Sequence, residues 1–197
     1  MISQNAYQFF LQRADKLALL SEGFKLGPAI MNYYKCIQIE PKNPVPYNKA
    51  GILFRQLNMN KYAEQFLRYA AYADGKNPEY FFLFGKYYFD NEQDYKKASG
   101  CYDTAAILGS VNVSGYLTNG EIKYIKLNNN EGALKDFNKA VALEPANKDA
   151  LNRRGIFYFE GLKNYKAALA DFESVKKLNP NDKVNNSNIE ACKEKLK

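Results

Sequence analysis

The chain has 197 residues, of which 46% are hydrophobic and 25% are charged, and it contains 13 Phe and 16 Tyr. This composition is typical of one folded domain or a short array of small units, and it excludes disorder over most of the length. Histidine is absent from the sequence. Sites that depend on imidazole, such as Ser/His/Asp triads and His-ligated metals, are therefore excluded. The formal net charge is +7.

The three cysteines, Cys36, Cys101 and Cys192, are odd in number and show no CxxC spacing. The sequence thus indicates neither a zinc site nor a complete disulfide framework, and it favours a reducing compartment. No run approaches the roughly 18 apolar residues of a membrane span. The residues after Met1 lack the basic and apolar segments of a secretory signal. We therefore predict a cytoplasmic protein without a membrane contact.

A period of 34 or 35 residues runs through the chain. At each period an alanine is followed, four residues later, by an aromatic residue or leucine. The alanines are Ala29, Ala63, Ala98, Ala133 and Ala168, and the large residues are Tyr33, Leu67, Tyr102, Phe137 and Phe172. Three positions after each of these large residues stands a further small or medium-sized residue. Small, large and small residues at i, i+4 and i+7 lie on one helix face, so each period predicts a helix that approaches its neighbour closely.

The first predicted repeat covers residues 5–43. Pro28 marks the start of its second helix and Pro41 closes the repeat. Its first helix contains no glycine, and Cys36 occupies a site where the other repeats mostly carry alanine.

The second and third predicted repeats cover residues 44–77 and 78–112. Each starts at the proline of an Asn-Pro pair, in which Asn is the N-cap and proline takes the first helical position. Their first helices contain Gly51 and Gly85. A glycine inside a helix costs up to about 1 kcal/mol relative to alanine, so its recurrence predicts that two backbones touch there. Asn60 stands where the second helix of the second repeat is expected to be capped.

The fourth and fifth predicted repeats cover residues 113–147 and 148–182. The third to fifth repeats each have one residue more than the second. In the fourth repeat either Asn119 or Gly120 could take the place of the recurring glycine. After these repeats, residues 183–197 are mostly polar and carry one narrow apolar stripe. This pattern predicts a terminal helix that caps the last repeat.

This pattern resembles the tetratricopeptide repeat (TPR) family. The family's order of large residue, Gly, Tyr, Ala, aromatic residue and Pro is found in the fifth repeat at Leu151, Gly155, Tyr158, Ala168, Phe172 and Pro180. The end of the third repeat, residues 105–109, is similar to the related Sel-type repeat. The resemblance implies an all-α fold, a right-handed α-α superhelix (solenoid) of about five helical hairpins plus a C-terminal capping helix, forming one domain over residues 1–197.

The resemblance also implies a function. First helices of such a solenoid line a concave groove that binds a peptide or helix of a partner protein, so the chain would be a non-enzymatic interaction module or scaffold. Carried over position by position, the groove residues are Asn48, Ile52, Arg55, Phe82, Lys86, Phe89, Thr118, Ile122, Ile125, Asn152, Ile156 and Phe159. The cations Arg55 and Lys86 favour an acidic or carboxylate-bearing partner.

Catalytic, cofactor and metal sites are not predicted. No glycine-rich phosphate-binding loop occurs. Asp90, Glu92 and Asp94 cluster at an expected turn, but the glycine and closing glutamate of a calcium-binding EF-hand are missing, so we interpret them as a solvated turn with an N-cap. Cys36 and Cys101 are interpreted as core thiols.

Two other functions stay open. The chain could be a co-chaperone, or a secretion or assembly chaperone that holds an unfolded segment. The five-residue carboxylate clamp of chaperone-binding TPR proteins is matched here only by Asn119 and Arg153, so that particular function is not assigned. Nucleic-acid binding through the basic surface is less favoured, because Lys and Arg are interleaved with acidic residues and no arginine-rich motif occurs.

Overall fold

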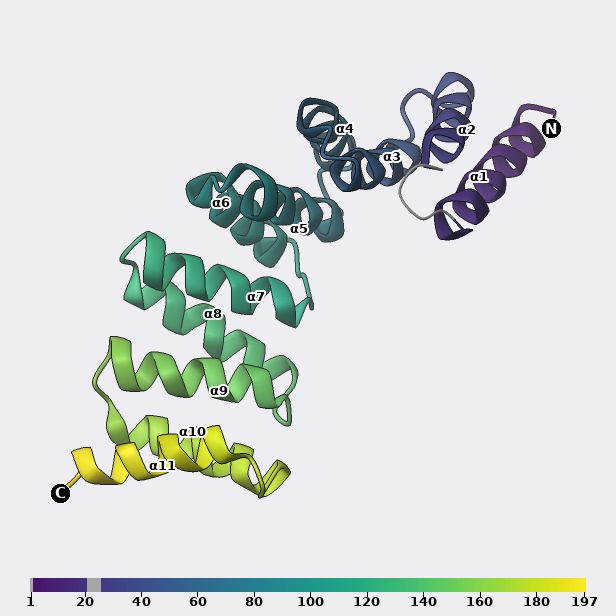
Figure 1. The fold of residues 1–197 in the computed structure, drawn as a ribbon. Coiled ribbons are helices and arrows are strands. Elements are labelled where there is room, and N and C mark those ends of the chain that lie inside the picture. Colours follow the sequence, from purple (N-terminus) through teal and green to yellow (C-terminus); the bar gives the residue numbers. More distant parts are fainter. Residues whose placement is uncertain (1, 21–25) are drawn as a thin grey trace. The chain divides into compact units, whose positions relative to one another are not determined.

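The computed structural model describes residues 2–20 and 26–197, and over these residues it consists of eleven α-helices without a β-strand (Figure 1). The helices are α1 (Ile2–Leu20), α2 (Leu26–Ile39), α3 (Pro44–Gln56), α4 (Asn60–Ala73), α5 (Pro78–Tyr87), α6 (Tyr95–Ile107), α7 (Val113–Glu121), α8 (Asn130–Leu143), α9 (Lys148–Ile156), α10 (Tyr165–Leu178) and α11 (Lys183–Lys195). Each odd-numbered helix from α1 to α9 packs against the next helix as a hairpin, and α11 packs on α10. The prediction of an all-α fold of five hairpins plus a final helix is confirmed. None of the described helices is both long and apolar enough to cross a membrane.

The chain divides into two compact units. Unit 1 spans Met1–Ser110 and contains α1 to α6, and unit 2 spans Val111–Lys197 and contains α7 to α11. The division falls between the third and fourth hairpins, close to the repeat boundary expected at residue 112. Because repeats in a stack contact only their neighbours, such a cut separates whole hairpins, and the single domain 1–197 stays a prediction.

The helix starts are capped largely as the sequence indicates. The Asn43 side chain accepts a hydrogen bond from the backbone N–H of Val45, and Asp94 accepts one from Lys97. The prediction for Asn60 was wrong: Met59 is the N-cap of α4 and makes no side-chain cap bond, and Asn60 is the first helical residue. Its backbone carbonyl instead accepts a hydrogen bond from the Tyr87 hydroxyl at 3.0 Å.

The additional residue of the third to fifth repeats lies in a π-helical turn at the end of the first helix. These turns are η2 (Tyr88–Glu92), η3 (Ile122–Lys126) and η4 (Phe157–Gly161). The second repeat lacks the residue, and α3 ends without such a turn. A π turn closes its hydrogen bonds from i to i+5, so it accommodates one more residue than an α turn.

Within each unit, the core lies between the helices of each hairpin and between neighbouring hairpins. All five alanines of the repeat pattern have a relative exposure of 0%. In unit 2 a Cβ on Gly120 would lie 2.9 Å from the Phe137 ring, and one on Gly155 would lie 2.7 Å from the Phe172 ring. Gly120, and not Asn119, therefore occupies the glycine place of the fourth repeat, which fixes the register that the sequence had left open.

Candidate functional site

The expected groove residues of unit 1 come from two successive first helices and the turn after the second. Asn48, Ile52 and Arg55 lie on α3, Phe82 and Lys86 lie on α5, and Phe89 lies on η2; all six are partly exposed. They therefore combine apolar side chains, an amide and two cations at positions that a partner could reach.

A carboxylate joins the two cations of this surface. The Asp90 Oδ2 atom lies 3.3 Å from Arg55 Nη1 and 3.2 Å from Lys86 Nζ, so helices α3 and η2 are tied together by one charge cluster. We call Arg55, Lys86 and Asp90 the charge triad; it carries one surplus positive charge. The three side chains are between 21% and 43% exposed. Ion pairs at such exposure contribute about 1 kcal/mol or less, so a competing carboxylate can displace Asp90.

An aromatic floor lies beside the triad. The rings of Phe82 and Tyr102 have their centroids 5.9 Å apart, and Tyr102 belongs to α6. Burial raises the pKa of Tyr102 above its ordinary value, and the negative charge of Asp90 raises it further. The hydroxyl therefore stays neutral at physiological pH. Tyr102 is buried, and the partly exposed Phe82 ring can take apolar groups of a partner next to the charge triad.

In unit 2 the expected residues of the fourth repeat do not form an equivalent set. Ile122 is only 1% exposed and belongs to the core, whereas Ile125 is 61% exposed and Thr118 is half-buried. The expectation for Ile122 is therefore wrong, because the place of Gly120 shifts the groove register by one residue. The positions equivalent to Asn152, Ile156 and Phe159 are Leu117, Glu121 and Tyr124.

The charges on this surface of unit 2 differ from those of unit 1. Arg153 on α9 pairs with Glu121 on α7 at 2.6 Å and with Asp149 at 2.9 Å. One arginine thus faces two carboxylates, which leaves a surplus negative charge. Arg153, whose place in the sequence corresponds to that of a clamp arginine, is already occupied by side chains of its own chain.

The fifth-repeat residues lie next to a small pocket. Asn152 and Phe159 are partly exposed and Ile156 is 41% exposed. A pocket of about 90 Å³ is lined by Ile156 and Phe159 together with Phe172, Ala191 of α11 and two polar side chains. Its volume suits one apolar side chain, so the capping helix contributes to this surface as well as covering the core.

One buried and one partly buried ion pair in unit 2 were missed by the sequence analysis. Lys123 lies 2.9 Å from Asp136. Arg154 donates two hydrogen bonds to Asp171, at 2.9 and 2.7 Å. Asp136 and Asp171 are one 35-residue period apart, a signal that could have revealed them. Both pairs link a first helix to its second helix, so these cations hold the hairpins together and are not offered to a partner.

The thiols of unit 1 do not form a reactive site. Burial raises the pKa of Cys36 and of Cys101 to about 11, so both thiols stay protonated near neutral pH, in the form that is a poor nucleophile. Over the part of the chain that the structure describes, no three His, Cys, Asp or Glu side chains are grouped to hold a metal ion.

Comparisons with known proteins support the repeat fold. Residues 124–147 and 149–182, less than a third of the chain, match the model of the tetratricopeptide repeat family. The chain is similar to the crystal structure of MamA, with 19% identity, a TM-score of 0.72 and coverage of 88% of this chain and 92% of that chain. It is also similar to a tetratricopeptide repeat protein from Parabacteroides merdae, with 18% identity, a TM-score of 0.74 and coverage of 98% and 74%.

A third similar structure is YrrB, described as a TPR protein with an unusual peptide-binding site, with 20% identity, a TM-score of 0.69 and coverage of 89% and 88%. At these identities the likeness establishes the fold. The family match is confined to residues 124–147 and 149–182, and over the rest of the chain the comparisons show a fold like that of tetratricopeptide repeat structures. The Sel-type character of the third repeat stays a prediction.

Proposed function

We propose that the chain is a non-enzymatic protein-binding module and that the first-helix surface of unit 1 binds a carboxylate-bearing segment of a partner protein. The observation that carries the proposal is the charge triad, in which Arg55 and Lys86 from successive repeats meet at one carboxylate. A partner carboxylate can take the place of Asp90 and accept hydrogen bonds from both cations, while its apolar neighbours pack on Phe82 and Phe89.

The surface is only partly preorganised for a ligand. Asp90 already holds both cations in place, so their side chains need little further ordering when a ligand arrives. The same carboxylate competes with the ligand for them. Affinity for an acidic segment thus depends on how much more strongly Arg55 and Lys86 bind the partner's carboxylate than the carboxylate of Asp90. Removing the charge of Asp90 is therefore expected to raise this affinity.

The test begins with capture of partners from the native cell and their identification by mass spectrometry, followed by calorimetric titration of the partner's acidic segment. We expect the double variant Arg55→Glu and Lys86→Glu to weaken binding at least tenfold, because a charge-assisted contact contributes about 1.5–3 kcal/mol. We expect Asp90→Asn to strengthen binding, since it releases both cations.

Lys61→Glu with Lys96→Glu is the matched control. It changes the net charge equally, but it places the new acids on the exposed sides of the second helices α4 and α6. Equal affinity of wild type and the Arg55/Lys86 double variant would contradict the proposal. So would an equal loss in the control, because it would show a general effect of charge.

A further inference from the structure

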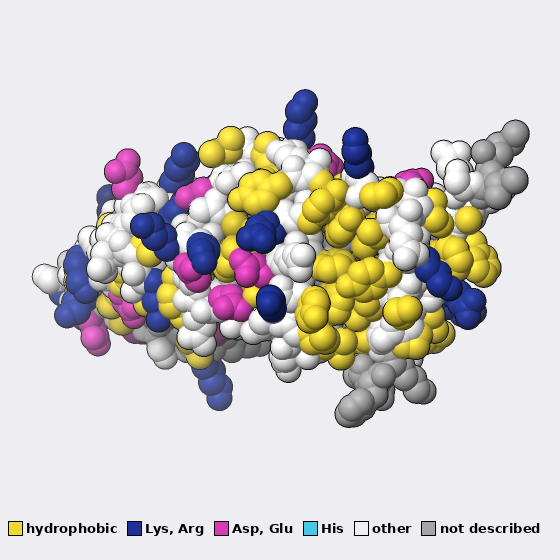
Figure 2. Space-filling model, turned by 90° about the horizontal axis from the view of Figure 1, so that it is seen from above, with side chains coloured by type: hydrophobic (Ala, Val, Ile, Leu, Met, Phe, Trp, Pro, Cys, Tyr) yellow, Lys and Arg dark blue, Asp and Glu magenta, His cyan; other side chains and the backbone are white. Residues whose placement is uncertain are grey.

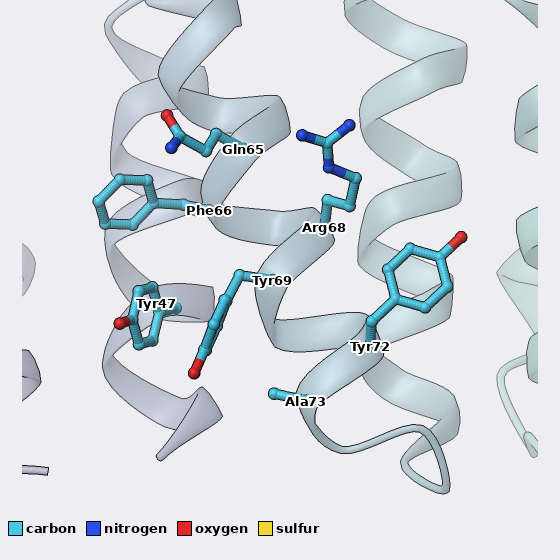
Figure 3. A pocket seen from close by; sticks show the side chains of 7 residues that line it. All are labelled: Tyr47, Gln65, Phe66, Arg68, Tyr69, Tyr72 and Ala73. Atoms are coloured by element: carbon cyan, nitrogen blue, oxygen red, sulfur yellow. The ribbon is translucent and has the colours of Figure 1, made fainter. Parts of the chain in front are cut away.

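An open pocket of about 580 Å³ lies along α4 in unit 1 (Figure 3). Four of its lining residues are aromatic: Tyr47 from α3, and Phe66, Tyr69 and Tyr72 from α4. Gln65, Arg68 and Ala73 complete the lining. In the view of Figure 2, hydrophobic side chains gather in one broad area over the N-terminal helices of unit 1. None of the residues that line this pocket belongs to the charge triad or its aromatic floor.

The aromatic wall of the pocket is fixed by its own contacts. The rings of Tyr47 and Tyr69 stack with centroids 3.9 Å apart, and both hydroxyls donate to the Pro41 carbonyl, at 3.1 and 2.8 Å. Phe66 is buried behind them, against Tyr47 and Tyr34. Since these two hydroxyls are used within the chain, Tyr47 and Tyr69 offer a ligand mainly ring surface.

The polar side chains of the pocket are all able to donate hydrogen bonds. Gln65, Arg68 and Tyr72 stand at i, i+3 and i+7 on one side of α4, and Figure 3 shows Arg68 between the other two. Arg68 is exposed and makes no ion pair with the residues that the structure describes, and Tyr72 is 70% exposed. The lining contains no Asp or Glu. A complementary ligand therefore brings apolar rings, several acceptors and one negative charge.

We propose that this pocket binds an extended, proline-containing peptide segment that carries a carboxylate. In a polyproline II segment the backbone carbonyls have no internal partners and are free to accept hydrogen bonds from Gln65 and Tyr72. Its proline rings pack on the faces of Tyr69 and Tyr72, as proline-rich segments do in aromatic-lined grooves. Its carboxylate accepts hydrogen bonds from the Arg68 guanidinium.

The dimensions of the donor row agree with such a ligand. Seven residues of an α-helix rise about 10 Å, which is the axial distance from Gln65 to Tyr72. One turn of polyproline II covers three residues and about 9 Å. The row thus matches one turn of the peptide, with a donor at each end and the cation between them. A helical ligand fits less well, because its carbonyls are already used within the helix.

The charge around the pocket favours such a peptide over a nucleic acid as the ligand. Residues 60–77, which cover α4 and the turn after it, contain three basic and two acidic residues: Lys61, Arg68, Lys76, Glu64 and Asp74. A strand of phosphates needs a row of cations for its affinity. This segment has a net charge of only +1 and offers a single cation in the pocket, which suits a peptide carboxylate and not a row of phosphates.

The test measures fluorescence anisotropy of a fluorescein-labelled peptide made of Pro-Pro-Glu repeats, added to the full chain at concentrations up to about millimolar, the range of weak protein–ligand affinities. We expect saturable binding, and weaker binding by at least tenfold for a Pro-Pro-Lys peptide and for a Gly-Ser-Glu peptide of equal length. Arg68→Glu and Tyr72→Ala are each expected to reduce affinity at least tenfold. Both side chains are exposed, so neither change is expected to unfold the chain.

Lys96→Glu, at an exposed cation of α6 that belongs to neither surface, is the control and is expected to leave Pro-Pro-Glu binding unchanged. Because Arg68 and Tyr72 lie outside the charge triad, loss of binding in their variants tests this pocket separately from the proposed function. Absence of saturable binding overturns the proposal. Equal affinity for the Pro-Pro-Glu and Gly-Ser-Glu peptides overturns it as well. A labelled single-stranded oligonucleotide that binds in a manner dependent on Tyr72 would assign the pocket to nucleic acid instead.

Discussion

At the scale of single residues, the fold depends on small side chains at helix contacts and on the backbone of the turns. Ala133 and the four equivalent alanines are fully buried, so no space remains there for a larger side chain. The turns before the second helices place Asn58, Gln93, Asn128 and Lys163 at positive φ, between 50° and 56°. Asn adopts this left-handed backbone readily, whereas at Gln93 and Lys163 it is a source of strain.

We predict that Ala133→Leu destabilises the chain, because overpacking of a filled core typically costs about 1–3 kcal/mol. The matched control is Ala142→Leu, which makes the same change at an exposed site of the same helix, α8. Urea unfolding followed by circular dichroism is expected to show a lower midpoint for Ala133→Leu only. Equal midpoints for the two variants would show that Ala133 is not at a close contact.

At Lys163 we predict a substitution that stabilises the chain. The φ of 52° at Lys163 costs a non-glycine residue about 1–2 kcal/mol. Glycine recovers this amount but loses about 0.5–1 kcal/mol of chain entropy, so Lys163→Gly is expected to stabilise by up to about 1.5 kcal/mol. Ala170→Gly, at an exposed position in the middle of α10, is expected to destabilise by about 1 kcal/mol. Thermal unfolding distinguishes the two, and a lower melting temperature for Lys163→Gly would contradict the prediction.

At the scale of elements, the π turns and the capping helix shape the surfaces available to a partner. One inserted residue turns the following part of a helix by about 100°, so η2, η3 and η4 decide which side chains after the glycine face outward. Asp90 lies in η2, and this turn places it between Arg55 and Lys86. The final helix α11 covers the apolar side of α10, with Asn185 donating a hydrogen bond to the Phe172 carbonyl at 2.8 Å.

We predict that Ile189→Ala in α11 costs about 2–5 kcal/mol, the usual range for removing a large buried aliphatic side chain. Ile189 is 2% exposed and shares a core cluster with Ala168, Phe172 and Cys192. Val184→Ala on the same helix serves as the control, since Val184 is 74% exposed and its truncation is expected to change little. A urea midpoint for Ile189→Ala equal to that of the control would mean that α11 does not cap the core.

At the scale of the whole molecule, many ionisable groups are buried in their neutral form. Burial raises the pKa of Tyr7 to about 12 and that of Cys36 to about 11. Burial is also the main cause of the raised pKa of Tyr33, Tyr87 and Tyr88, where a nearby carboxylate accepts a hydrogen bond from the hydroxyl. These groups lie in the first and third hairpins, so unit 1 is expected to lose stability in alkali.

The sign of the pH dependence follows from these shifts. A raised pKa means that the folded state holds its proton more tightly than the unfolded state, so the stabilisation is complete below the unfolded pKa values of about 9 for Cys and 10 for Tyr. It is lost as the pH rises from there toward the folded values. We therefore predict that the urea midpoint falls between pH 9 and pH 11. An unchanged midpoint over this range would contradict the prediction.

The sequence by itself determined the repeat, the number of helices and the residues that pack between them. A 35-residue period and the helical spacing of Ala133 and Phe137 are local patterns, and they hold in any arrangement of the hairpins. Only the tertiary structure decided the register of the fourth repeat, because Asn119 and Gly120 are neighbours in sequence and only the Phe137 ring, which leaves no space for a Cβ, distinguishes them.

The tertiary structure also decided the charge of the candidate surfaces. Arg55 is a plausible free cation in the sequence, but its pairing partner Asp90 stands 35 positions later. The two meet only because successive repeats stack with a π turn inserted. The pocket along α4 likewise joins Tyr47 of one helix to Tyr69 of the next, a contact set by the packing of whole helices, which no local pattern encodes.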